Sequence, residues 1–262
     1  MVIALSASTL GQDSPGALLW DVDGTLAETE RDGHRLAFNR ALAEAGLDWQ
    51  WSVEEYGQLL TIAGGRERLS HDLEQREGAR PDPERVERLQ ASKQRHYAAL
   101  LAQGGISLRP GVRRLITAAQ QAGWCQAIVT TSGRQAVEAL VRSQLADLRS
   151  AFALWICGED VRRKKPDPEA YHQAIAALKL PTERMVAIED SLPGLGAARA
   201  AGLTTLVTLS TFSATEPLEH FSAAAALWDG LGEPDQAARP LQGPAAPTRC
   251  IDLDYLASLR GN

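Results

Sequence analysis

The hydrophobic and polar positions of this 262-residue chain change their spacing along its length, and each change predicts a different kind of element. Residues 18–20 form a continuous apolar run, which is typical of a strand buried on both faces. From residue 28 to about residue 106 the apolar positions recur every three or four residues, as on one face of a helix. The pattern therefore predicts one buried strand followed by a block of helices that contains no strand.

Beyond residue 106, short apolar runs alternate with helical patterns. Such alternation predicts right-handed βαβ crossovers, and therefore a doubly wound parallel sheet with helices on both faces, a Rossmann-like α/β fold. The expected strands are 18–20, 124–130, 152–157, 185–188 and 203–209. The expected helices are 111–119, 137–145, 168–178 and 192–201. Since the first strand belongs with this sheet, we expect residues 28–106 to be a helical insertion in a core of residues 17–27 and 107–262.

The two ends of the chain carry weaker patterns. Residues 1–16 are mildly apolar and then rich in Gly, Ser and Pro, without the basic start of a signal peptide, so we expect a flexible tail. Residues 232–248 are rich in Pro, Gly and Ala, which favours an irregular surface segment. Residues 250–259 are expected to form a last helix, or a strand and helix, against the core.

Composition narrows the class of protein. Apolar residues make up 44% and charged residues 23%, as in a globular protein, and the net charge of −6 argues against nucleic acid or an anionic membrane as the main partner. No apolar run approaches the roughly 18 residues that cross a bilayer. Cys125, Cys157 and Cys250 are far apart, which argues against a disulfide framework or a zinc site and fits a reducing cytoplasm. A monomer is the default expectation, because no strongly apolar helix face stands out.

Polar groups follow the predicted strands or lie shortly after them, at the edge where parallel sheets bind ligands. An Asp-Val-Asp-Gly sequence alone also fits a solvated turn, but four such groups, remote in sequence, are expected to meet in space. They are Asp21 with Asp23, the small hydroxyl turn Thr130, Thr131 and Ser132, then Lys165, and Glu189 with Asp190. We therefore interpret the polar groups as one site.

The side chains of this site favour phosphoryl chemistry. Four carboxylates offer hard oxygen ligands and no thiolate, which selects Mg²⁺ over softer metals. Lys165 can balance their charge and hold an anion, while the Thr130 hydroxyl and the N–H groups of the following turn can hold phosphate oxygens. One aspartate can attack phosphorus while the other moves a proton, which gives an aspartyl-phosphate.

This arrangement resembles the haloacid dehalogenase superfamily of phosphotransferases over nearly all of residues 17–210. Residues 21–25 (Asp-Val-Asp-Gly-Thr) are similar to its first motif, Thr130 to its second, Lys165 to its third, and Glu189-Asp190 to its fourth. The resemblance implies that Asp21 is the nucleophile and Asp23 the general acid/base. It also implies Mg²⁺ on the Asp21 carboxylate, the Asp23 backbone carbonyl and Asp190, with Glu189 assisting through water. Two aspartates in the first motif imply phosphoryl transfer rather than dehalogenation.

The inserted helices occupy the position of a C1 cap in that superfamily. Residues 23–30, 34–35, 48–51, 64–68 and 192–195 are similar to the CbbY proteins. This resemblance implies a phosphatase for xylulose 1,5-bisphosphate, a side product that inhibits Rubisco, and thus a link to the Calvin cycle. Arg66, where members often have lysine, and the turn at 133–135 depart from the family, which leaves the substrate less defined than the reaction.

A bisphosphate needs a second anion site, and arginine can grip phosphate through two N–H groups. The candidate substrate-binding residues of the cap and the sheet rim are Glu30, His34, Arg35, Gly65, Arg66, Arg68 and Arg134. The competing interpretations are solvated surface arginines, a packed histidine and an acidic first turn of a helix. Trp49 and Trp51 are better explained as cap core than as a sugar-stacking platform.

Three alternatives to this phosphatase remain open at the level of sequence. A mutase of the β-phosphoglucomutase type would share the fold, cap and motifs but return the phosphoryl group to a sugar. A phosphatase for another small sugar phosphate would share every motif. A binding protein without activity is disfavoured, because Asp21, Asp23, Lys165 and Asp190 are all present. The helical block and its flanking glycines also suggest a cap that closes over the site.

Overall fold

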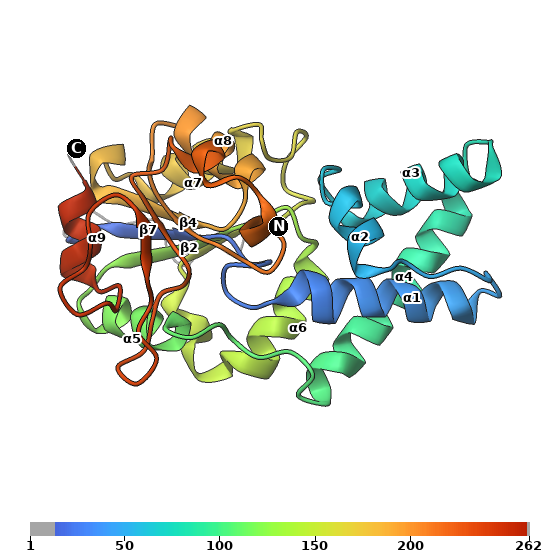
Figure 1. Ribbon diagram of the computed structural model, residues 1–262, viewed down its shortest axis with the longest axis horizontal. Coiled ribbons are helices and arrows are strands. Elements are labelled where there is room, and N and C mark those ends of the chain that lie inside the picture. Colours follow the sequence, from blue (N-terminus) through green and yellow to red (C-terminus); the bar gives the residue numbers. More distant parts are fainter. Residues whose placement is uncertain (1–13, 261–262) are drawn as a thin grey trace.

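A computed structural model describes residues 14–260 and shows a sheet with its helices beside a separate block of four helices (Figure 1). The strands are β1 (Ala17–Trp20), β2 (Cys125–Val129), β3 (Leu154–Ile156), β4 (Met185–Glu189), β5 (Thr204–Thr208), β6 (Ala226–Trp228) and β7 (Pro240–Gln242). The α-helices are α1 (Arg35–Glu44), α2 (Val53–Leu59), α3 (Gly65–Glu77), α4 (Pro83–Ala102), α5 (Val112–Gln121), α6 (Arg134–Gln144), α7 (Glu169–Leu178), α8 (Leu192–Ala200) and α9 (Leu253–Leu259).

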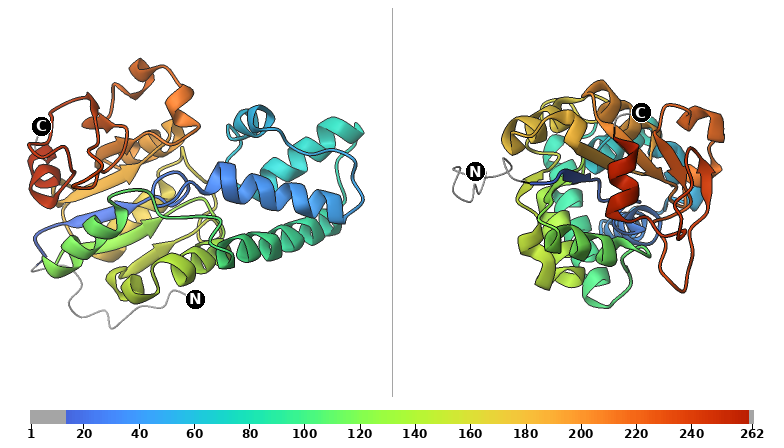
Figure 2. Two further views of the ribbon diagram at one scale, coloured as in Figure 1. Left: turned by 60° about the horizontal axis from the view of Figure 1, so that its bottom comes forward. Right: turned by 90° about the vertical axis from the view of Figure 1, so that its left-hand side faces the viewer.

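The strands form one sheet in the order β3-β2-β1-β4-β5-β6-β7, and only the β6–β7 pair is antiparallel. All four residues of β1 are buried, because alternate side chains enter two different cores. Leu18 and Trp20 pack towards α5, α6 and α9, whereas Ala17 and Leu19 pack towards α7 and α8. Helices therefore cover both faces of the sheet (Figure 2), and the doubly wound α/β fold predicted from the sequence is confirmed.

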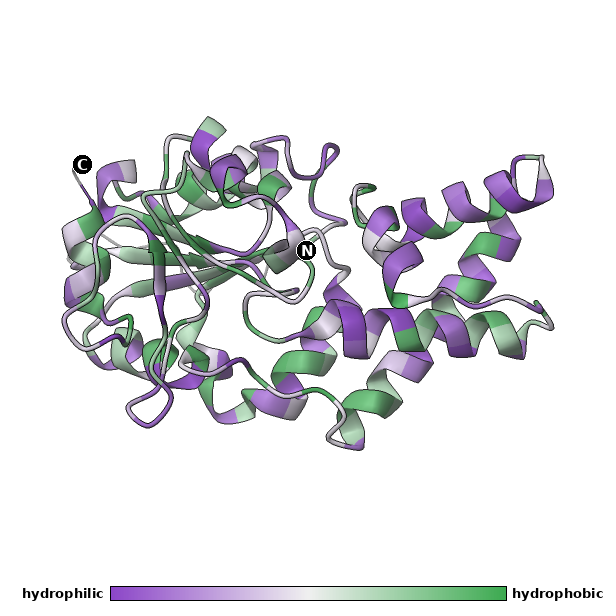
Figure 3. Cartoon of the chain, viewed as in Figure 1, coloured by the Kyte–Doolittle hydropathy of each residue, from purple (hydrophilic) through white to green (hydrophobic). Residues whose placement is uncertain are grey.

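The block of four helices has a core of its own. Phe38, Trp51 and Tyr56 are fully buried there, and Trp49 packs against them. The Trp51 indole N–H donates a 2.8 Å hydrogen bond to Asp72, so both tryptophans belong to the core of the block, not to a stacking platform. Hydrophilic residues predominate along α3 of this block, whereas the strands of the sheet are mostly hydrophobic (Figure 3).

Two terminal segments differ from expectation. Residues 1–13 of the expected tail lie outside the described residues, but Ser14 and Gly16 are buried, and the Gly16 carbonyl accepts a 3.0 Å hydrogen bond from Cys125 N. Most of residues 232–248 are irregular and exposed or half-buried, as expected, but the three-residue strand β7 lies within the segment, and Ala238 and Ala246 are buried. An edge strand tolerates proline, so a composition typical of turns did not reveal this strand.

The last helix agrees with its prediction. Helix α9 begins after Asp252, whose carboxylate accepts a 2.8 Å hydrogen bond from Tyr255 N, and its apolar face packs on the sheet core. Within residues 14–260, no helix is long and apolar enough to span a bilayer.

Candidate active site

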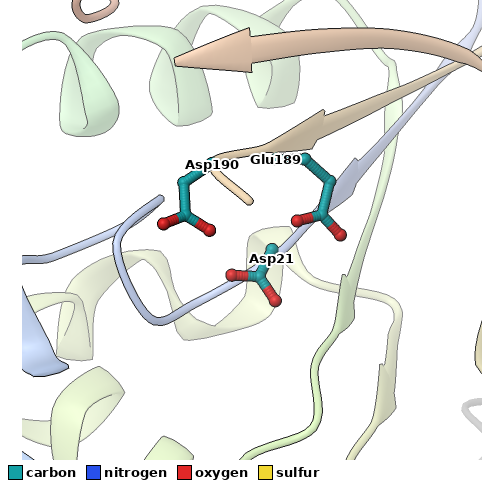
Figure 4. Close-up of side chains that lie close together, drawn as sticks. All are labelled: Asp21, Glu189 and Asp190. Atoms are coloured by element: carbon teal, nitrogen blue, oxygen red, sulfur yellow. The ribbon is translucent and has the colours of Figure 1, made fainter. Parts of the chain in front are cut away.

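Three carboxylates meet where β1 and β4 end. Asp21 directly follows β1, Glu189 is the last residue of β4 and Asp190 follows it. The two strands are neighbours in parallel register, so their carboxyl ends coincide, and Asp21 N donates a 3.0 Å hydrogen bond to the Ile188 carbonyl. One carboxylate oxygen from each residue lies within 4.8 Å of the others, and the three side chains point toward one another (Figure 4).

Lys165 lies inside this acidic cluster. Its ammonium group donates hydrogen bonds to Asp21 Oδ1 at 2.8 Å, to Glu189 Oε1 at 2.7 Å and to the carbonyl of Val129 at 2.7 Å. Val129 is the last residue of β2. Burial alone would lower the pKa of Lys165, but the two carboxylates raise it above its ordinary value, so the side chain stays charged. Tyr171 on α7 donates a 2.5 Å hydrogen bond to the same oxygen of Glu189.

One lysine does not neutralise three buried carboxylates. Burial, and then the neighbouring carboxylates, raise the pKa of Asp21 well above its ordinary value despite Lys165. Burial and Glu189 raise the pKa of Asp190 to about 7. The second oxygen of Glu189 is buried and has no hydrogen-bond partner among residues 14–260. Hard oxygen ligands with excess negative charge fit a divalent cation such as Mg²⁺.

The turn after β2 lies beside the cluster. Thr130 is buried, and its N–H donates a 3.0 Å hydrogen bond to the Ile156 carbonyl at the end of β3. Its hydroxyl oxygen accepts a 3.1 Å hydrogen bond from Ser132 N, which holds the turn in a compact shape. Val129, the residue before Thr130, binds Lys165 through its carbonyl, so the second and third polar groups are neighbours as predicted.

The Asp23 carboxylate is separate from the acidic cluster and turns towards the helical block. Its Oδ1 accepts a 2.5 Å hydrogen bond from Thr29 and lies 2.9 Å from His34 Nε2, while the Ser132 hydroxyl donates to Oδ2. Burial would raise the pKa of Asp23, but His34 and these two hydroxyls together lower it below the ordinary value. The two aspartates of the first motif therefore have different surroundings.

Lys93 is a buried cation that the sequence analysis missed. Its ammonium lies 2.9 Å from His34 Nδ1, its side chain is among the buried polar groups at 3% exposure, and burial lowers its pKa to about 8. A signal was present in the sequence, because Lys93 lies four residues from both Leu89 and Tyr97 on the apolar stripe of α4. A charged residue in such a stripe is buried with a partner or has a function.

A narrow cavity separates the helical block from the sheet. Glu30, His34, Gly65 and Arg68 line it from the block, and Thr131 and Ser132 line it from the turn after β2. Three further polar side chains line it from α4 and were not predicted from the sequence: Gln90, Lys93 and Gln94. Within the block, Arg68 donates a 2.8 Å hydrogen bond to the Tyr56 hydroxyl, which in turn donates to Glu30 at 2.5 Å.

Three of the predicted arginines lie elsewhere. Arg35 donates a 3.1 Å hydrogen bond to the Trp51 carbonyl inside the block. Arg66 is 55% exposed and forms a 2.5 Å ion pair with Glu87. Arg134 forms an ion pair with Asp160. Each arginine pairs with an acceptor that only the fold brings close, so its partner does not follow from its position in the sequence. The structure does not bring these three arginines to the cavity.

Known proteins are similar to this chain in sequence and in fold. Residues 15–202 match the family model of haloacid dehalogenase-like hydrolases. The chain is 43% identical over 246 residues to the CbbY protein of Cupriavidus necator. The matched region covers 92% of this chain and 94% of that protein. A mutant of CbbY from Rhodobacter sphaeroides, solved in complex with xylulose-(1,5)bisphosphate, is 41% identical with a TM-score of 0.77, covering 84% of this chain and 96% of that one. A β-phosphoglucomutase from Clostridium difficile is 16% identical with a TM-score of 0.70, covering 94% and 96%, and shares the fold.

Proposed function

Because this chain belongs to the haloacid dehalogenase-like hydrolases and is related to the CbbY proteins, we propose that it is a magnesium-dependent phosphatase that converts xylulose 1,5-bisphosphate into xylulose 5-phosphate. The observation that carries this proposal is the Asp21 carboxylate, which Lys165 holds beside Glu189 and Asp190 while Asp23 is held apart. The substrate rests on the relative that was solved with that bisphosphate. We also propose that the protein is a cytoplasmic monomer, as expected from the sequence.

The two aspartates divide the chemistry. An Asp21 oxygen attacks phosphorus as the bond from phosphorus to the sugar oxygen breaks, and Asp23 gives that oxygen a proton. This step requires that the bound substrate displace the hydrogen-bond donors that keep Asp23 ionised in the structure. Water then attacks the aspartyl-phosphate, with Asp23 taking its proton, so that phosphate leaves and Asp21 is restored. Mg²⁺ held by the Asp21 and Asp190 carboxylates and the Asp23 carbonyl, with Glu189 assisting, would supply positive charge beside the phosphoryl group. Lys165 and the turn at Thr130 bind the remaining phosphate oxygens.

Side chains of the helical cap bind the second phosphate and the sugar hydroxyls of the substrate. Arg68 and Lys93 line the cavity and can bind the second phosphate, together with the N-terminus of α3 at Gly65. Glu30 and His34 can bind sugar hydroxyls. The side-chain oxygens of Gln90 and Gln94 are buried without a partner in the described part of the chain, so they can accept hydrogen bonds from those hydroxyls.

A substrate panel tests the proposal. Phosphate release is measured with xylulose 1,5-bisphosphate, β-glucose 1-phosphate and other small sugar phosphates, with Mg²⁺ and with a chelator. We expect the bisphosphate to have the highest kcat/KM and the chelator to abolish turnover. Asp21→Asn should lose at least about 10³-fold in kcat while its circular dichroism is unchanged. Isomerisation of β-glucose 1-phosphate without phosphate release would instead establish a mutase.

A further inference from the structure

Arg109 lies where the chain returns from the cap to the sheet. The first linker (residues 26–29, after β1) and the second linker (residues 105–110, before α5) run side by side, since Arg109 N donates a 2.9 Å hydrogen bond to the Leu26 carbonyl. Ala27 and Leu108 also pair as an isolated bridge. Between the linkers lies a crevice lined by residues from both, including Glu28 and Arg109. The linkers are therefore joined at a few points and are not packed along their whole length.

The Arg109 guanidinium joins two segments that are remote in sequence. Its side chain is only 9% exposed. One terminal nitrogen donates to the Gly24 carbonyl in the loop after β1, and to the Thr208 carbonyl at the end of β5, 3.0 Å away. The other donates to the Leu209 carbonyl at 2.6 Å. A guanidinium presents five N–H groups in a rigid fork, so one side chain can hold several carbonyls at fixed positions.

Both segments that Arg109 joins touch the acidic cluster. Gly24 follows the aspartates of the first motif, and the Asp190 carboxylate lies so close to its Cα that any side chain there would collide with it. On the other side, Leu209 precedes Ser210, and a side chain at Gly24 would collide with the Cβ of Ser210 as well as with the Asp190 carboxylate. The spacing of these two loops therefore sets the space around Asp190.

Glu28 extends the same connection to the cap. One of its carboxylate oxygens lies 3.4 Å from Arg109 Nε, and the other accepts a 3.3 Å hydrogen bond from Thr211 N. Glu28 belongs to the first linker, and Thr211 belongs to the loop after β5. The linker, the Gly24 loop and the β5 loop are thus held by one buried charge and its carboxylate partner.

We infer that Arg109 is a positioning residue that fixes the loop of Asp21 and Asp23 against the loop that supports Asp190, and so sets the geometry of the cation site. This inference rests on the proposed function, because it assigns the acidic cluster to a divalent cation. Arg109 does not line the cavity beside the cap, so its effect on the reaction passes through the two loops. Lysine in its place would keep the charge but lose the fork that holds both carbonyls.

Arg109→Lys tests this inference, and Arg114→Lys is its matched control. Arg114 also donates to three carbonyls, those of Leu231, Gly232 and Ile251, far along the chain from the acidic cluster. Mg²⁺ affinity is measured by titration calorimetry, and kcat and KM with p-nitrophenyl phosphate and the best sugar phosphate. Thermal unfolding shows whether the two variants lose similar stability.

We expect Arg109→Lys to weaken Mg²⁺ binding about tenfold and to lower kcat more than tenfold, with KM changed less than about threefold. Arg114→Lys should stay within about twofold of the parent in all three quantities. Equal Mg²⁺ affinity and equal kcat in the two variants would show that Arg109 is merely structural. Calorimetry with Mg²⁺ alone does not depend on the sugar, so a failure of the proposed substrate leaves this test intact.

A second variant decides the matter if Arg109→Lys does not fold. Glu28→Gln keeps the shape of the linker and removes only the charged partner of Arg109. Since Glu28 is 33% exposed, this change should leave the folded state intact. We expect Mg²⁺ affinity to fall at least about threefold with an unchanged melting temperature. Unchanged affinity in a folded Glu28→Gln protein would overturn the inference.

Discussion

At the scale of single residues, Lys93 is a buried lysine whose ammonium faces a histidine. It connects to the first motif through His34, which lies 2.9 Å from Lys93 on one ring nitrogen and 2.9 Å from Asp23 on the other. An ammonium can only donate, so it assigns His34 Nδ1 as acceptor and leaves Nε2–H to donate to the carboxylate. Lys93 thereby orients the histidine that holds the proposed acid/base.

Lys93→Met should therefore impair catalysis more than binding of the substrate's reacting phosphate. Without the ammonium, His34 loses the contact that fixes its tautomer, and Asp23 loses a nearby positive charge. We expect kcat to fall between about 10- and 100-fold. Lys179→Met, at an exposed position after α7, is the matched control and should retain full activity. Unchanged kcat in folded Lys93→Met would show that the lysine does not act on the reaction through His34.

The same scale shows what sequence can predict about a site. Asp21, Lys165 and Asp190 could be placed because parallel strands end at one edge, so their positions follow from topology. The direction of a long side chain does not follow from topology. Arg66 and Arg134 lie near the site in sequence, yet each turns to a carboxylate that only the packing of helices and loops brings close.

At the scale of elements, the cap helix α4 packs on α6 of the sheet domain, and two loops of the sheet domain also contact the cap. Lys164, next to Lys165, forms a 2.5 Å ion pair with Glu67 in the first turn of α3. In the loop after β5, Phe212 packs against the core of the cap, with its ring 6.0 Å from that of Tyr56. Both loops also support the acidic cluster. Closure of the cap stays a prediction from the sequence, and these contacts would couple such a movement to the loops that carry or support the reacting groups.

Lys164→Gln should favour an open cap. The ion pair is partly exposed, so its removal costs little stability, and we expect KM to rise about threefold with a smaller change in kcat. High salt should raise the KM of the parent and have less effect on the variant, because salt screens the pair. Lys179→Gln controls for the lost charge. If parent and variant have the same KM and the same salt dependence, the pair does not contribute to closure.

Elements with long, regular patterns were predictable. The apolar runs of β1, β2, β4 and β5 and the stripe of α7 lie within a few residues of their predicted bounds. Strand β6 has only three residues, and β7 combines proline with polar side chains at an edge, so neither carries a periodic signal. The π-helical turn Glu30–His34 also escaped prediction, because a single widened turn is too short to carry a periodic signal of its own.

At the scale of the whole molecule, the acidic cluster makes stability depend on pH. Burial and Glu189 raise the pKa of Asp190 from 3.8 to about 7, so between these values the folded protein binds more protons than the unfolded chain. The free energy of unfolding therefore falls as pH rises through this window, and the loss is complete above the folded pKa. A divalent cation binds the ionised carboxylates, so it should stabilise the protein most where protons stabilise it least.

We expect the metal-free protein to melt about 5 °C lower at about pH 8 than at about pH 6. Excess Mg²⁺ should raise the melting temperature more at the higher pH and so reduce or reverse this difference. Asp190→Asn is the control, because it removes the titrating group and a proposed ligand together. That variant should melt with a weaker pH dependence in chelator and should gain little from Mg²⁺. A Mg²⁺ effect equal at both pH values in the parent would mean that the cation binds elsewhere or that Asp190 is ionised throughout.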